Sequence, residues 1–353
     1  MKRVIKQSLG IDVSKDTLDY SLAELTEDFE VSTRESSQVL NNKKGGEKLL
    51  KVIEKYSIPG VPLQVIVEAT GVYHELICCF LKDSNIDIAI VMPKKISNYV
   101  KSNDIRTITD KISAIQIAEF GLMKKLDSWK KPDVHLKRIK GLSRERSQLV
   151  DERTRLKNQI HAKKYSAYES ESILKRMKER VTILERQIEE VEQELKAIVK
   201  GLPELKEKVE KICSIRGVGF ITAMAIIGET DGFNLIKNSR QLVCYAGYDV
   251  VHKESGSSVK TKGKMSHKGN SYIRRALYFP SLQAVRGEGF FEMFYTRLYK
   301  KQAIKLKAYA AVQRKLLIMI YTLWKKDEYY EPGKHKGLKC FEQSERTAQT
   351  ELA

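Results

Sequence analysis

Three carboxylates in the first third of the chain have the residue type and the local context of a divalent-metal site. Asp12 lies inside an apolar run, Glu68 follows a second apolar run, and Asp110 precedes a helical pattern. A lone carboxylate in apolar surroundings must be paired, hydrogen-bonded or bound to a cation, because an unpaired buried charge is costly. Carboxylate oxygens suit Mg²⁺. We therefore predict that all three bind Mg²⁺. The alternatives are an exposed strand end for Asp12 and a simple helix N-terminal charge for Asp110.

A second candidate site is a basic stretch in the last third of the chain. Between Lys253 and Arg275 there are seven Lys or Arg and one acid. Such cations contact phosphates, which gives affinity for nucleic acid without reading its sequence. A solvated basic loop is the alternative. The predicted nucleic-acid contacts are Lys253, Lys260, Lys262, Lys264, Lys268, Arg274 and Arg275.

Two glycines upstream of this stretch add a further candidate contact. Gly217 and Gly219 lie between two apolar helical stretches, in the pattern of a helix-hairpin-helix turn. Glycines there let backbone amides approach a phosphate at a helix N-terminus. A tight turn without any ligand is the simpler alternative.

The elements that must position the carboxylates follow the order of an RNase H-like α/β domain, which we predict for residues 1–128. Three strands come first, and strands then alternate with helices. We expect strands at 4–13, 17–22, 29–33, 63–71 and 86–91, and helices at 42–56, at 73–82, after Pro93 and from Asp110, with Thr109 as N-cap. In this order Asp12 lies in the middle of the sheet and Glu68 at the end of the strand beside it.

A charged helical pair is predicted for residues 129–205. Apolar residues from Met177 to Leu202 alternate steps of four and three over about three and a half heptads, which is typical of a coiled coil. The seam could join two copies of the chain or close an intramolecular hairpin, and we favour the first. Residues 206–330 are predicted to form a mainly helical domain, and the polar residues 331–353 a disordered tail.

Composition limits the partners. The chain has 353 residues and a formal net charge of +19, with a pI near 9.5, which indicates a polyanionic partner. No apolar run reaches the length of a membrane span, so we expect nucleic acid rather than a membrane. The five cysteines include no CxxC pair, so neither a disulfide framework nor a zinc site is predicted.

The sequence resembles the DEDD transposases of bacterial insertion sequences in three motifs of its first third. These are Gly10-Ile11-Asp12-Val13-Ser14-Lys15, Val67-Glu68-Ala69-Thr70-Gly71 and Thr109-Asp110-Lys111-Ile112-x-Ala114. The resemblance implies a RuvC-like domain that binds Mg²⁺ through four acidic residues. Three of them correspond to Asp12, Glu68 and Asp110, and the fourth position holds Ser113. A weaker metal affinity, an impaired copy and an altered residue are all consistent with that serine.

The last third resembles the C-terminal domain of the same family. It carries Tyr-Ala-Gly, then Ser-Gly, then Lys-Gly-x-x-Ser-x-x-Gly-Asn-x-x-x-Arg-Arg in the same order. The resemblance implies a serine that attacks a DNA phosphate and becomes covalently linked to it. By position Ser255 is the candidate nucleophile, with Ser257 and Ser258 as rivals.

The resemblance further implies an RNA-guided site-specific DNA recombinase. A guide-type non-coding RNA would direct it to donor and target DNA, and the protein would act as a dimer or tetramer in the bacterial cytoplasm, with the nucleoid. Two other functions remain open. One is a RuvC-type metal-dependent nuclease without a covalent intermediate, and the other is a degenerate copy that only binds nucleic acid.

Overall fold

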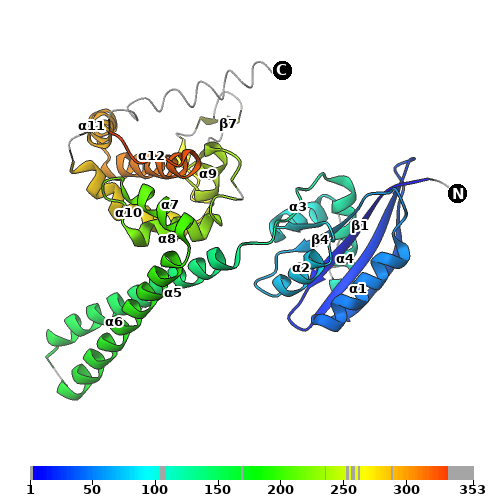
Figure 1. The fold of residues 1–353 in the computed structure, drawn as a ribbon, viewed down its shortest axis with the longest axis horizontal. Helices are drawn as coiled ribbons and strands as arrows, with labels where there is room; N and C mark the ends of the chain where they lie inside the picture. The colour runs from blue at the N-terminus through cyan, green and yellow to red at the C-terminus, as the bar shows by residue number, and fades with distance from the viewer. Residues whose placement is uncertain are drawn as a thin grey trace. The chain divides into compact units, whose positions relative to one another are not determined.

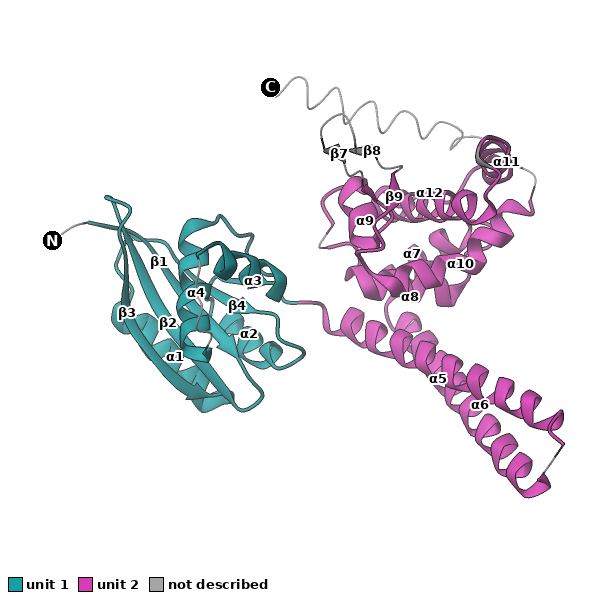
Figure 2. Cartoon of the chain, turned by 180° about the vertical axis from the view of Figure 1, so that it is seen from behind, with its two compact units in different colours: residues 1–131 teal, residues 132–353 magenta. Residues whose placement is uncertain are grey.

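The chain divides into two compact units, residues 1–131 and residues 132–353 (Figure 2). The computed structural model describes residues 3–103, 109–167, 170–234, 236–251, 254–255, 259–260, 263–287 and 289–332. Among the described helices, none combines the length and the apolar surface that a bilayer span requires.

Unit 1 is built on a mixed five-stranded sheet. Its strands are β1 (Val4–Val13), β2 (Thr17–Thr26), β3 (Val31–Leu40), β4 (Leu63–Glu68) and β5 (Ile88–Val91), in the order β3-β2-β1-β4-β5. The central strand β1 pairs antiparallel with β2 and parallel with β4. This order and these directions are those of the RNase H-like fold, so the predicted fold class is confirmed.

The two faces of the sheet are covered by different helices, because successive side chains of a strand point to opposite faces. On one face Leu9 and Ile11 pack with residues of α1 (Lys43–Tyr56) and α2 (His74–Asp83). On the other face lie α3 (Pro93–Ser102) and α4 (Asp110–Met123), which contribute Ile96 and Ile117 to a second cluster (Figure 1). The even-numbered residues of β1 therefore face α4.

The third strand differs from its prediction at residues 29–33. It runs from Val31 to Leu40, and Phe29 lies in the preceding turn at a φ of 61°. The strand is polar because it forms the edge of the sheet and pairs only with β2. A sequence with few apolar residues gives a weak strand pattern, which explains the short prediction.

Unit 2 begins with a long helical hairpin, α5 (Val134–Lys164) and α6 (Glu171–Lys200) (Figure 1). The apolar stripe of α6 packs against α5 of the same chain, where Leu156 meets Met177 and Val181. The heptad seam is thus filled within one chain, as in the hairpin alternative. A second copy is not required to cover it, and the predicted homo-oligomer stays a prediction.

The rest of unit 2 is a helical domain with one continuous core that includes the base of the hairpin. Its helices are α7 (Pro203–Cys213), α8 (Phe220–Thr230), α9 (Ser239–Ala246), α10 (Ser271–Val285), α11 (Phe290–Gln302) and α12 (Lys305–Lys326). Leu316 and Ile320 of α12 are fully buried among them, together with Ile139 of α5 and Leu195 of α6. A left-handed residue, Ala303, separates α11 from α12. The predicted disordered tail lies outside the described residues from position 333 onward.

Candidate active site

Asp12 and Glu68 lie at the same edge of the sheet in unit 1. The parallel register of β1 and β4 aligns Ile11 with Val67, so the next residues, Asp12 and Glu68, emerge together at the carboxyl ends of the two strands. Glu68 is two residues beyond Ile66, which packs on the face covered by α3 and α4. Both carboxylates therefore point to that face, and both are half-buried.

Two glycines bring α4 close enough to add Asp110. A Cβ atom on Gly10 would lie 2.4 Å from the backbone oxygen of Ala114, and one on Gly121 would lie 2.3 Å from Ser8 Oγ. The helix therefore rests directly on β1. Asp110 is its first residue, one turn before Ala114, and Thr109 caps the helix by accepting a hydrogen bond from the backbone of the third residue of α4 at 3.3 Å.

Ser113 and Asp19 complete the group around Asp12. The Ser113 hydroxyl, one turn into α4, is close enough to the Asp12 carboxylate to lower its pKa by hydrogen bonding. Asp19 lies directly opposite Asp12 in the antiparallel register and is 9% exposed, and Gln38 Nε2 donates to its Oδ2 at 2.8 Å. Asp19 is absent from the predicted site. The predicted hairpin could have identified it, because pairing Val13 with Leu18 puts residues 12 and 19 opposite each other.

Among the described residues, no cation acts on the raised pKa values of Asp12 and Glu68. Burial, followed by the charge of Asp110, raises the pKa of Asp12, and burial, followed by the charge of Asp12, raises the pKa of Glu68. The Ser113 hydrogen bond acts in the opposite direction on Asp12. Opposed like charges on neighbouring strands are destabilising. The arrangement therefore favours a bound cation or proton.

The donor set fits a hard divalent cation at an open site. In the described part of the chain, no three His, Cys, Asp or Glu side chains converge closely enough to enclose a metal ion by themselves. Mg²⁺, however, is commonly held by one or two carboxylates together with substrate phosphates. Asp12 and Glu68 are placed to supply those carboxylates, with Asp110, Asp19 and Ser113 beside them. We call this group of five residues the acidic edge.

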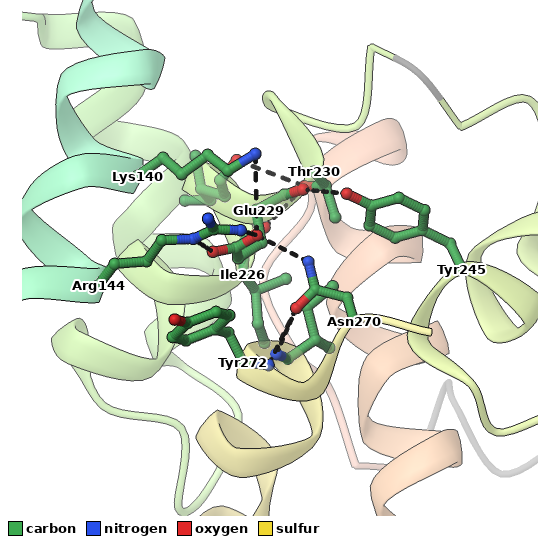
Figure 3. Close-up of polar contacts among 10 residues, drawn as sticks. Lys140, Arg144, Ile226, Glu229, Thr230, Tyr245, Asn270 and Tyr272 are labelled. Atoms are coloured by element: carbon green, nitrogen blue, oxygen red, sulfur yellow. Dashed lines mark hydrogen bonds and ion pairs between the residues drawn. The ribbon is translucent and has the colours of Figure 1, made fainter. Parts of the chain in front are cut away.

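In unit 2 the most buried charged group is Glu229, near the end of α8. Its side chain is 1% exposed, and its two oxygens accept hydrogen bonds from Arg144 Nε and Nη2 of α5, at 2.6 and 2.9 Å. Lys140 Nζ lies 3.9 Å from Oε2, and Asn270 Nδ2 donates to the same oxygen at 2.7 Å. Figure 3 shows the two cations approaching from α5 and Asn270 from the opposite side. Burial alone raises the pKa of Glu229, but these partners outweigh it and hold the pKa below its usual value.

Asn270 also closes the base of the segment that carries the predicted phosphate-binding lysines. We call this segment, residues 253–268, the basic loop. Its backbone N–H donates to the Tyr245 carbonyl at 2.8 Å, and the Tyr245 hydroxyl donates to the Glu229 carbonyl at 2.9 Å. Gly247 and Gly269 allow the two ends of the loop to touch, since a Cβ on Gly269 would lie 2.4 Å from the Gly247 nitrogen. We call these four residues, Tyr245, Gly247, Gly269 and Asn270, the loop base.

The predicted phosphate contacts lie on both sides of the loop base. Lys264, in β9 (Lys264–Met265), and Lys268 are exposed, and β9 pairs with β6 (Val250–Val251). Arg274 donates to the Ala246 carbonyl at 2.8 Å, and Arg275 pairs with Asp151 of α5. Both guanidinium groups thus have protein partners already. A role in binding nucleic acid stays a prediction for all of them.

The candidate nucleophile is described only through its backbone. Ser255 ends the two-residue strand β7 (Glu254–Ser255), where it pairs with Val259 of β8 (Val259–Lys260). The backbone of Lys260 lies in the same hairpin. The rivals Ser257 and Ser258, and the predicted contacts Lys253 and Lys262, lie outside the described residues.

Gly217 and Gly219 have different environments in the turn between α7 and α8. Gly217 has a φ of 87°, and a Cβ there would lie 2.9 Å from the Pro280 carbonyl of α10, so close packing accounts for this glycine. Gly219 precedes α8 and faces open space. Of the two, only Gly219 has room for a phosphate beside it.

Comparison with known proteins gives two family matches and full-length relatives. A model of the IS110-type DEDD transposase domain, described as a transposase, matches residues 9–163, and one described as the transposase IS116/IS110/IS902 family matches residues 209–296. The pilin gene-inverting protein of Moraxella lacunata is 27% identical over 340 residues, covering 94% of this chain and 99% of the relative. The transposase for insertion sequence element IS1111A of Coxiella burnetii is 26% identical over 240 residues, covering 60% of this chain and 63% of the relative. Among solved structures, Thermus thermophilus RuvC in complex with a Holliday junction substrate matches 35% of this chain and 99% of its own, with 9% identity and a TM-score of 0.28.

Proposed function

We propose that this chain is a DNA transposase or recombinase of the IS110/IS116/IS902 family, and that it cuts and rejoins DNA through a covalent link between Ser255 and a DNA phosphate. The observation that carries the proposal is the acidic edge, in a chain whose residues 9–163 and 209–296 match models of transposase families. Carboxylates with raised pKa values at the edge of such a sheet are candidates for metal-assisted chemistry at phosphate.

In the proposed reaction the acidic edge and the basic loop meet at one scissile phosphate, within one copy of the chain or between two. The Ser255 oxygen bonds to phosphorus, the bond from phosphorus to the leaving sugar oxygen breaks, and the serine proton passes to a carboxylate. The sugar oxygen takes up a proton. Attack by a sugar hydroxyl of another strand reverses these steps, so the number of phosphoester bonds is conserved.

The residues of the acidic edge would hold Mg²⁺ through Asp12, Glu68 and Asp110, with Ser113 beside them. When bound, Mg²⁺ neutralises charge on the phosphate and lowers the cost of the pentavalent transition state. The lysines of the basic loop, Lys264 and Lys268 among them, would hold the DNA backbone.

A guide RNA and a multi-subunit assembly are further parts of this proposal. The net charge of +19 supports a protein that binds two kinds of nucleic acid at once, and the family resemblance supports a structured non-coding RNA as the guide. Sequencing the RNA that copurifies with the protein tests this part. A random sample of cellular RNA would contradict it.

Covalent trapping tests the central step. The full chain is incubated with Mg²⁺ and end-labelled duplexes that carry the DNA flanking this gene in its own genome, and the products are separated on a denaturing gel. We expect protein-linked DNA with the wild type and none with Ser255→Ala, while the affinity for DNA and RNA is unchanged. Single substitutions of Ser257 and Ser258 by alanine are the matched controls.

The other outcomes are equally distinct. Cut DNA without attached protein would favour the metal-dependent nuclease. Binding without cleavage across a Mg²⁺ and Mn²⁺ series would favour a degenerate binding protein, which the neutral Ser113 makes worth testing. Full activity in Ser255→Ala would exclude Ser255 as the nucleophile.

A further inference from the structure

The carboxylate of Glu229 joins two parts of unit 2 that are far apart in sequence. Its Oε2 atom accepts from Arg144 of the helical hairpin at 2.9 Å and from Asn270 of the loop base at 2.7 Å. A displacement of α5 therefore acts directly on the oxygen that holds the loop base. Figure 3 shows these partners on opposite sides of the carboxylate.

Asn270 passes this connection on to α10. Its Nδ2 donates to Glu229, while its Oδ1 accepts from the backbone N–H groups of Tyr272 and Ile273, at 3.0 and 3.2 Å, and so caps the helix. An amide does both through two separate atoms, a donor nitrogen and an acceptor oxygen. An aspartate here could cap α10 but would repel Glu229.

We propose that Glu229 is a positioning residue of the strand-exchange reaction, which fixes the base of the basic loop to the helical hairpin through Asn270 and Arg144. The inference rests on the proposed function, because the loop carries Ser255. A buried ion pair adds little to stability over a packed apolar pair, so its value lies in fixing a geometry.

Nearby contacts also hold Arg144 and α5 in place around Glu229. The Arg144 guanidinium also lies over the Tyr272 ring, 4.5 Å from its centroid, and α8 approaches α5 so closely that a Cβ on Gly228 would lie 2.8 Å from Lys140 Cα. Arg144 is thus held by both the first turn of α10 and the end of α8. The hairpin, α8 and the loop base therefore meet at the Glu229 carboxylate.

The test compares three variants of the full chain. Asn270→Ser keeps a helix-capping hydroxyl but lacks the Nδ2 atom through which Asn270 reaches Glu229, and Glu229→Gln removes the charge. Arg146→Gln is the control, because Arg146 pairs with Glu192 at 2.6 Å, which ties α5 to α6 and not to the loop. Cleavage of the flanking-DNA duplexes is measured in a single turnover, together with DNA affinity, melting temperature and hydrogen exchange of peptides from the loop base.

We expect Asn270→Ser and Glu229→Gln to slow covalent attachment about 10- to 100-fold, the loss that follows when a reacting group is displaced by about 1 Å. DNA affinity should stay within about twofold, and exchange at the loop base should become faster. Arg146→Gln should match the wild type in all of these. Asn270→Ser keeps the buried ion pair, so it remains informative if Glu229→Gln unfolds.

Three results would overturn the proposal. One is wild-type attachment rates in Asn270→Ser. Another is a rate loss that merely follows DNA affinity or the folded fraction. The third is unchanged exchange at the loop base in both variants. If the wild type itself never becomes attached to DNA, the proposed function fails, and the exchange measurement alone still decides whether Glu229 controls the loop base.

Discussion

Replacing Ser113 by aspartate tests whether the acidic edge binds a metal. Ser113 lies one turn into α4, is half-buried, and is close enough to Asp12 to lower its pKa by hydrogen bonding. An aspartate removes this donor and adds a negative charge beside Asp12 and Asp110. Without metal the variant should therefore be less stable than the wild type. With Mg²⁺ the same charge becomes an additional ligand, and the difference in stability between variant and wild type should shrink.

The size of the effect follows from charge and exposure. Two unit charges about 5 Å apart repel by roughly 3 kcal/mol at an effective dielectric constant of about 20. Solvent screening at a half-exposed position reduces this to about 1 kcal/mol. The lost hydrogen bond to a charged group adds about 1.5 kcal/mol. A tenfold gain in Mg²⁺ affinity returns about 1.4 kcal/mol once the site is saturated.

Thermal unfolding of the full chain, followed from EDTA through a Mg²⁺ titration, measures both effects. Ser113→Asn is the control, since it has nearly the same size as aspartate but no charge. We expect the melting temperature of Ser113→Asp to rise with Mg²⁺ by a few degrees more than that of Ser113→Asn. Its cleavage activity should also persist to lower Mg²⁺. Equal Mg²⁺ dependence in the two variants would refute the assignment of Ser113 as a ligand position.

Two further predictions concern the assembly of the acidic edge. Gly10→Ala should lower the free energy of unfolding in urea by about 1–3 kcal/mol, because its Cβ would lie 2.3 Å from the Ala118 nitrogen. Gly141→Ala, in open space on α5, should instead raise it by about 0.5–1 kcal/mol. Equal effects of the two substitutions would contradict the packing argument. The raised pKa values of Asp12 and Glu68 mean that the folded chain binds protons more readily than the unfolded chain. Without metal, stability from these groups should therefore be greatest below the ordinary carboxylate pKa and fall as the pH rises through the raised values. Urea midpoints between about pH 4 and pH 7 should show a smaller fall in Asp12→Asn, and an identical fall would exclude Asp12 as a source.

The sequence was sufficient for the features that depend on local pattern. Strand β1 has its predicted bounds, and Thr109 caps α4 as its spacing indicated. The convergence of Asp12 and Glu68 was also accessible, because parallel neighbouring strands end at the same edge of a sheet. Each of these inferences needs only residues that are close in sequence, together with one rule of chain geometry.

Features that depend on distant partners were not accessible in the same way. Glu229 lies in an apolar helix, and nothing in its neighbourhood indicates Arg144, which is 85 residues away. The heptad pattern of α6 showed that an apolar seam must be covered but not which helix covers it, since α5 of the same chain and a second copy offer similar surfaces. In both cases the tertiary structure selects one of several partners that the pattern allows.

The two groups of carboxylates have opposite environments, and this difference supports their different proposed roles. In the described part of the chain no lysine or arginine neutralises Asp12 or Glu68, and the pKa of each is raised. Glu229 is more buried, yet Arg144, Lys140 and Asn270 hold its pKa below the usual value. Charges left without protein partners are available to a cation and its phosphate, whereas a fully partnered charge can only hold its neighbours in place. A neutral Ser113 then has a physical rationale, because one acid fewer lowers the repulsion between the carboxylates of the acidic edge in the metal-free state.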